Sequence, residues 1–249
     1  MSETAGHLSV KGTAIAWRRV AGSGPTLVWL GGFRSEMAGT KADALAAWAT
    51  ARGRAFLRFD YFGHGLSGGD FPEGTITRWR ADAVAVLDEL TEGPVVLAGS
   101  SMGGWLACLV AMARSDKIAG MVLVAPAADF TSALLAPSLT AEAREAIARD
   151  GVWRAPSAYD PPGYPITRAL LEDGARWSIL PGPVPIEAPV RILQGGEDAE
   201  VPWRHALELA LAMKSSDVVF NLIRDGDHRL SRPADIARLI AAAEELTSP

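Results

Sequence analysis

The chain has 249 residues, 49% of them hydrophobic, and a formal net charge of -5. This length and composition allow one full hydrophobic core, so we expect residues 1–249 to form a single domain. The negative charge and the scattered basic residues argue against nucleic acid as a partner, and no apolar run reaches the roughly 20 residues of a membrane span.

The predicted elements alternate between strands and helices. Lys11-Gly12 has the pattern of a hairpin turn, and Thr40 with Asp43 resembles a capping box at the start of a helix. The alternation predicts an α/β fold with a mainly parallel central sheet flanked by helices. In chain order, the predicted elements are a β-hairpin over 7–20, a strand over 26–30, a helix from Thr40, a strand over 54–60, a helix over 77–91, a strand over 94–98, a helix over 102–113, a strand over 118–125, a strand over 190–195, a helix after Pro202, a strand over 218–223 and a helix over 234–246.

Residues 130–188 interrupt this alternation. Helical patterns over 139–149 and 167–174 flank a loop over 156–165 that is rich in proline and tyrosine. A long segment of this kind within a compact domain is usually functional, so we expect a small helical lid. Its aromatic side chains either line an apolar acyl pocket or pack the lid onto the sheet. They are Trp153, Tyr159, Tyr164 and Trp177.

The junction between the strand over 94–98 and the following helix carries the motif Gly99-x-Ser101-x-Gly103. In a nucleophile elbow, a strained turn exposes the serine hydroxyl, and the glycines avoid collisions of a Cβ with the strand or helix. The pentapeptide alone is equally typical of a structural turn. The order of its partners favours the elbow, because Asp198 and His228 each follow a later predicted strand, and nucleophile, acid and histidine occur in this order in α/β-hydrolases.

The acid has two rivals in the sequence. Glu197 adjoins Asp198, and Asp129 follows the strand after the elbow, a position from which some α/β-hydrolases supply their acid. The pattern Gly-Gly-Glu-Asp-x-x-Val-Pro ending at Pro202 favours Asp198. Asp60, at the end of its strand, is expected to hold a loop instead.

Three segments resemble the α/β-hydrolases, namely 31–37, 58–68 and 99–105. The similarity covers almost the whole chain and is strongest to the branch that contains the mitochondrial acyl-protein thioesterase, which also cleaves acyl glucuronides. The first residues of the chain, Met1 to His7, are not typical of a signal or transit peptide, so the chain resembles a bacterial relative and is expected in the cytoplasm. The resemblance implies a catalytic triad of Ser101, Asp198 and His228.

The remaining histidines and the cysteine have structural interpretations. His7 is near the terminus, His205 is on a predicted helix, and His64 belongs to a Gly-His-Gly loop that normally shapes the backbone of this family. The single cysteine, Cys108, cannot form an internal disulfide, and its apolar surroundings indicate a small buried side chain rather than a reactive thiol.

The oxyanion of a tetrahedral intermediate requires fixed hydrogen-bond donors. The backbone N–H of Met102, after the nucleophile, is one candidate, and the N–H of Phe33 is the second. Gly31-Gly32-Phe33 stands where the family usually has His-Gly-x, so a glycine replaces the histidine. The alternative is a plain glycine turn after a strand.

These residues predict a serine hydrolase that cleaves carboxylic esters or acyl thioesters through an acyl-enzyme, as a depalmitoylating thioesterase or an acyl-glucuronide esterase. The expected partner is a small-molecule or acylated substrate, with no cofactor and no metal, since His-Glu-x-x-His is absent from the sequence. A haloalkane dehalogenase would need aspartate in place of Ser101. Two alternatives stay open: a cofactor-free perhydrolase or haloperoxidase, and a non-catalytic ligand receptor on a hydrolase scaffold. The acyl group, the leaving group and the oligomeric state are not specified by the sequence.

Overall fold

The computed structural model describes residues 3–156 and 163–248, and its centre is a mainly parallel sheet of eight strands within those residues. The strand order is β1-β2-β4-β3-β5-β6-β9-β10. Only β1 with β2 and β2 with β4 pair antiparallel, whereas the other neighbours are parallel. The strands are β1 (Thr4–Val10), β2 (Thr13–Val20), β3 (Ser23–Leu30), β4 (Arg54–Phe59), β5 (Val95–Ser100), β6 (Ile118–Val124), β9 (Val190–Gly195) and β10 (Val218–Ile223).

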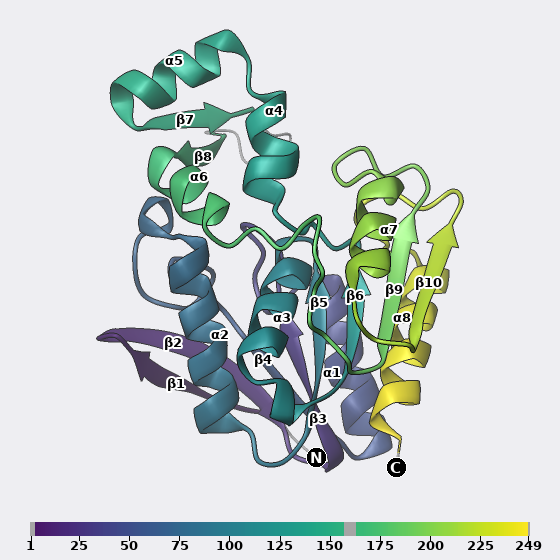
Figure 1. The fold of residues 1–249 in the computed structure, drawn as a ribbon. Helices are drawn as coiled ribbons and strands as arrows, with labels where there is room; N and C mark the ends of the chain where they lie inside the picture. The colour runs from purple at the N-terminus through teal and green to yellow at the C-terminus, as the bar shows by residue number, and fades with distance from the viewer. Residues whose placement is uncertain (1–2, 157–162, 249) are drawn as a thin grey trace.

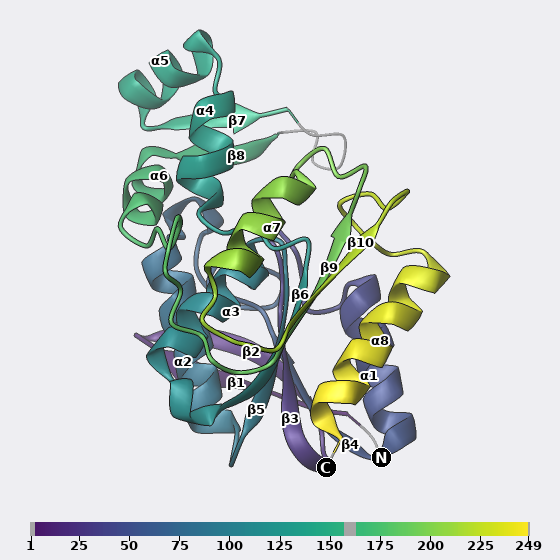
Figure 2. The ribbon, with the colours of Figure 1, turned by 45° about the vertical axis from the view of Figure 1, so that its right-hand side comes forward.

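Helices cover both faces of the sheet, as Figure 2 shows. One face carries α1 (Thr40–Arg52) and α8 (Pro233–Thr247), and the other carries α2 (Ile76–Leu90), α3 (Met102–Ala113) and α7 (Trp203–Ala212). Each face has its own hydrophobic core. Burial on both sides explains why every residue of β5 and of β9 is buried, as expected for central parallel strands.

The predicted strands and helices of the sheet are present, and the predicted α/β fold with a mainly parallel central sheet is confirmed. Lys11 and Gly12 form the hairpin turn with φ of 49° and 79°. Short 3-10 helices, η1 (Phe71–Glu73) and η2 (Ser115–Lys117), were not predicted, because three-residue turns leave no periodic pattern in a sequence.

The predicted capping box at the start of α1 is wrong. The helix begins at Thr40, but its N-cap is Gly39 and no side chain caps it. The carboxylate of Asp43 instead accepts a hydrogen bond from the guanidinium of Arg58 on β4. The Arg58 side chain is only 5% exposed, and Glu3 pairs with it as well. A buried guanidinium needs carboxylate partners, and this demand takes Asp43 away from the helix terminus.

Residues 130–188 are called the insert, and the helices and strands that the structure describes in it lie above the carboxyl ends of the central strands (Figure 1). The two predicted helical pieces are present, but so is an antiparallel pair of strands that the sequence did not predict. Pro165 lies within one of them, and a two-stranded sheet tolerates proline because both strands are edges. The elements of the insert are η3 (Phe130–Leu135, a π-helix), α4 (Ala136–Ser138), α5 (Ala141–Asp150), β7 (Val152–Ala155), β8 (Tyr164–Thr167) and α6 (Arg168–Ala175).

The contact between Asp43 and Arg58 leads to a prediction about stability. Asp43→Ala should lower the free energy of unfolding by about 1–2 kcal/mol, because it removes a hydrogen bond to a charged group. In an Arg58→Met background the same substitution should cost close to nothing. Urea unfolding of the four proteins of this double-mutant cycle measures the coupling. An equal loss of unfolding free energy in both backgrounds would mean that Asp43 stabilises the protein as a helix cap and not through Arg58.

Candidate active site

Ser101 lies at the turn between β5 and α3 in a strained backbone conformation, with φ of 55° and ψ of -121°. The turn requires glycine on both sides. A Cβ on Gly99 would lie 2.3 Å from the carbonyl oxygen of Gly103, and a Cβ on Gly103 would lie 2.1 Å from that of Leu30. Both distances are far below van der Waals contact, so the two glycines let the helix approach the sheet closely. Ser101 itself is half-buried.

A continuous chain of hydrogen bonds joins Ser101, His228 and Asp198. The Oγ of Ser101 is 3.1 Å from Nε2 of His228, and Nδ1 of His228 is 2.9 Å from Oδ2 of Asp198. With the proton on Nδ1 donated to the carboxylate, Nε2 is the acceptor for the serine hydroxyl. The exposed carboxylate of Glu200 lies 3.5 Å from the same Nε2, a neighbour that sequence reasoning missed.

Asp198 is held in place by four donors. Besides His228, the backbone amides of Glu200 and Val201 donate to its Oδ1 at 2.9 and 2.8 Å, and Nε2 of Gln194 donates to Oδ2 at 3.1 Å. Burial by itself would raise the pKa of Asp198, but the hydrogen bonds and the charge of its neighbours outweigh burial and hold the pKa below its usual range. The carboxylate therefore stays ionised beside His228.

The two rival acids have other positions. Asp129 accepts hydrogen bonds from the amides of Ile179 and Leu180, at distances of 2.9 to 3.0 Å, so it ties the end of β6 to the last part of the insert, after α6. Burial raises its pKa. The side chain of Glu197 is exposed. Asp198 is the carboxylate that the structure brings to His228.

The loop after β3 lies directly against Ser101. A Cβ added to Gly32 would be 3.4 Å from Cβ of Ser101, and the amide of Ser35 closes a turn onto the carbonyl of Gly32 at 3.1 Å. Phe33 is the second residue of this turn. Met102, on the other side, is the first residue of α3, and amides in the first helical turn have no partner within the helix. The two predicted donors thus come from segments that flank Ser101.

Asp60 and His64 accept hydrogen bonds from backbone amides of nearby loop residues. Asp60 accepts from the amides of Met37 and Leu66 at 2.7 and 2.8 Å, as expected for a residue that holds a loop. His64, which the sequence suggested only as a backbone-shaping residue, is buried and its Nε2 accepts from the amide of Arg34 at 3.3 Å. The Gly-His-Gly sequence pointed to His64, but it did not identify the amide of Arg34 as the partner of its ring.

Two of the four aromatic residues singled out in the insert contact the body of the domain. Tyr164 lies edge-on to the ring of Phe33, 6.3 Å between centroids, so it faces the loop beside Ser101. Trp177 instead donates from Nε1 to the hydroxyl of Thr77 on α2 and stacks with Arg80, so it packs the insert onto the body. Trp153 is half-buried on β7, and Tyr159 lies outside the described residues.

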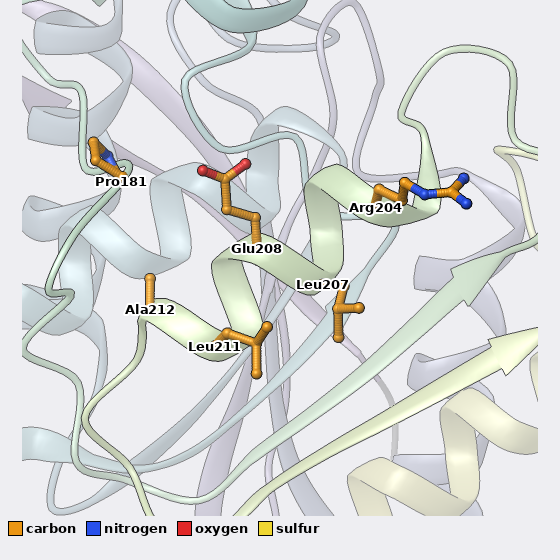
Figure 3. A pocket seen from close by; sticks show the side chains of 6 residues that line it. All are labelled: Pro181, Arg204, Leu207, Glu208, Leu211 and Ala212. Atoms are coloured by element: carbon orange, nitrogen blue, oxygen red, sulfur yellow. The ribbon is translucent and has the colours of Figure 1, made fainter.

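A separate surface cavity of about 330 Å³ lies against α7, far along the chain from the elbow (Figure 3). Leu207 and Leu211 leave one side of the helix and Glu208 the other, so its lining mixes apolar and charged groups. The cavity contains none of the predicted site residues.

The single cysteine, Cys108, is fully buried in α3. Burial raises the pKa of its thiol to about 12, which matches the interpretation of Cys108 as a structural residue.

The described residues contain neither a cluster suited to a metal ion nor a membrane-spanning helix. No group of three or more His, Cys, Asp and Glu side chains among them is arranged to hold a metal ion. None of the helices in this part of the chain is long and apolar enough to cross a membrane.

Comparisons with known proteins agree with the fold. The mitochondrial palmitoyl-protein thioesterase ABHD10 of mouse is 37% identical over 233 residues, which cover 93% of this chain and 78% of the relative. Its solved structure superposes with a TM-score of 0.89 and covers 98% of both chains at 36% identity. A protein from Agrobacterium vitis S4, provisionally named a hydrolase, superposes with a TM-score of 0.96 at 41% identity over 100% of both chains. Residues 22–239 match the family model for the alpha/beta hydrolase family. The chain therefore belongs to the α/β-hydrolase family.

Proposed function

We propose that this hydrolase cleaves acyl thioesters and carboxylic esters with Ser101 as nucleophile, His228 as general base and Asp198 as the residue that orients the imidazole. The observation that carries the proposal is the unbroken hydrogen-bond chain from the strained Ser101 through His228 to an ionised, fully paired Asp198. This constellation is defined by geometry and roles, and each of its members meets the required contact.

The proposed reaction has two halves. His228 removes the proton from Ser101 as its Oγ attacks the acyl carbon, and the amides of Phe33 and Met102 bind the oxygen that becomes negative. The imidazolium then protonates the leaving group, and an acyl-enzyme forms on Ser101. Water, activated by the same Nε2, hydrolyses this ester and restores the free serine. The reaction consumes one water and needs no cofactor.

The apolar surroundings of the oxyanion loop support an acyl chain as the substrate group. The ring of Phe33 packs against Phe130 and Tyr164 of the insert, so part of the wall beside Ser101 comes from aromatic carbon. The relatives named palmitoyl-protein thioesterases support the thioester over other acyl derivatives. We therefore assign the insert, residues 130–188, the role of a lid over an acyl pocket within a single domain.

Two finer points remain proposals. Hydrolysis of acyl glucuronides is supported by the resemblance of the sequence alone, so an acyl glucuronide belongs among the substrates tested. The cytoplasmic location is likewise proposed from the sequence alone, whereas the ABHD10 relatives are named as mitochondrial.

Ser101→Ala should reduce hydrolysis by on the order of 10⁴ to 10⁶ while the melting temperature changes little, because the triad acts as a unit. The matched control is Ser100→Ala, which removes the neighbouring buried hydroxyl from the end of β5. Initial rates and labelling with a fluorophosphonate probe measure both variants. Activity that survives in Ser101→Ala but is lost in Ser100→Ala would refute the assignment.

Asp198→Asn should lower kcat by about 10³ to 10⁴, because an amide no longer favours the imidazole tautomer with the proton on Nδ1. Asp129→Asn should cost much less, since its carboxylate binds the amides of Ile179 and Leu180 rather than His228. Steady-state kinetics of the two variants provide the comparison. The reverse ranking would mean that the acid of the triad is supplied from the end of β6.

Acyl thioesters should be hydrolysed well, activated esters also, and amides poorly, because a thiolate leaves with less assistance than an amine. Each methylene buried in the pocket should contribute up to about 0.8 kcal/mol, or about fourfold in kcat/KM, until the pocket is full. A panel of thioesters and esters from two to sixteen carbons, with an acyl glucuronide included, measures this. Indifference to chain length or a preference for amides would eliminate the acyl-thioesterase function.

A further inference from the structure

The loop that carries the proposed oxyanion donor Phe33 has a strained backbone at the residue after it. Gly31 and Gly32 precede Phe33, and Arg34 follows it with φ of 59°, a conformation that residues with a side chain rarely adopt. The turn is closed by one backbone bond, from the amide of Ser35 to the carbonyl of Gly32. A turn with positive φ at its third residue normally carries glycine there, so this backbone needs support from outside the loop.

His64 supplies a contact at the strained residue. Its Nε2 accepts the amide proton of Arg34 at 3.3 Å, and its Nδ1 donates to the carbonyl of Phe62 at 3.1 Å. Both ring nitrogens are therefore used, and together these two bonds define one tautomer. The acceptor bond requires the neutral ring. Burial lowers the pKa of His64 to about 4, with a smaller effect of the charge of Arg34 in the same direction, so the ring is neutral at physiological pH.

The His64 ring has no room to turn away from this contact. It is 3% exposed and lies edge-on to Tyr61, Phe71 and Trp79, with centroid distances of 5.5, 4.9 and 5.2 Å. Phe71 and Trp79 also pack against the ring of Phe33, at 5.0 and 5.9 Å. The same cluster thus holds the side chain of Phe33 directly and the peptide after it through His64.

We propose that His64 is a positioning residue for the oxyanion hole: by accepting the amide of Arg34 it fixes the turn that presents the amide of Phe33 to the oxygen of the substrate. It does not touch the substrate. The inference rests on the proposed function, because it assigns a task only if Ser101 forms a tetrahedral intermediate.

Three substitutions of His64 distinguish the loss of its hydrogen-bond acceptor from the loss of its packing. His64→Gln places an amide oxygen near the position of Nε2, so it can still accept from Arg34. His64→Asn is too short for that bond although it can donate to Phe62, and His64→Phe keeps an aromatic ring without any acceptor. Removing an entire oxyanion donor costs about 10² to 10³ in kcat. Displacing one should cost less, and we expect kcat to fall about 10- to 100-fold in His64→Phe and His64→Asn, with KM within about twofold, whereas His64→Gln should stay within about fivefold of the wild type.

The measurement that separates positioning from general loosening is the affinity for an aryl trifluoromethyl ketone, which forms a reversible tetrahedral adduct with a serine. The inhibition constant should rise by the same factor as kcat falls, while fluorophosphonate still labels one serine per chain. Ile15→Ala is the matched control, because Ile15 is fully buried in the same core but belongs to β2. At a comparable drop in melting temperature, its ketone affinity should remain that of the wild type.

The possible results distinguish a positioning role of His64 from a purely structural one. Normal kcat and normal ketone affinity in His64→Phe, or the same losses in Ile15→Ala, would overturn the positioning role while leaving the proposed function intact. If His64→Phe does not fold, the contrast between His64→Asn and His64→Gln gives the answer, and equal activity of these two overturns the inference. A wild-type protein that neither hydrolyses the substrate panel nor reacts with fluorophosphonate would overturn the proposed function itself, and this is observed before any variant is made.

Discussion

The close approach of α3 to the ends of β3 and β5 is the constraint on which the site depends. The Cα of Gly103 faces the carbonyls of Leu30 and Gly31 at a separation that no side chain would permit. This contact places the start of the helix beside the loop after β3, so the two segments that carry Met102 and Phe33 flank the same serine. The unfavourable backbone angles of Ser101 persist because packing on both faces of the sheet determines them.

The two histidines near this junction, His228 and His64, have different electrostatic surroundings. His228 is half-buried and faces an ionised Asp198, whose hydrogen bonds outweigh the effect of burial on its pKa. His64 is buried among aromatic rings, and burial lowers its pKa. One imidazole therefore has a carboxylate that stabilises a positive charge, whereas the other is kept neutral and serves as an acceptor. The identity of the residue is the same, and its surroundings decide its chemistry.

The sequence predicted the sheet, its covering helices and the three residues of the hydrogen-bond chain. These depend on local signals: apolar periodicity for the elements, and glycines and chain order for Ser101, Asp198 and His228. It failed where a distant partner competes for a residue. Asp43 has the spacing of a helix cap, but Arg58 is a buried cation that binds two carboxylates, those of Glu3 and Asp43. The strands β7 and β8 were missed for a related reason, because each is four residues long and is defined by its pairing with the other.

The hydrogen bonds of Asp129 also affect how readily the segment that follows it can change in length and sequence. Asp129 immediately precedes the insert, and the amides it binds, Ile179 and Leu180, lie in the segment that leads back to β9. The chain therefore leaves the end of β6 and comes back to one clamped point beside it before it continues to the start of β9. A segment whose ends are fixed together can gain, lose or exchange residues at a low entropic cost, because the distance it must span does not change. The residues between Asp129 and Ile179 can accordingly be exchanged as one segment while Ser101, His228 and Asp198 keep their positions.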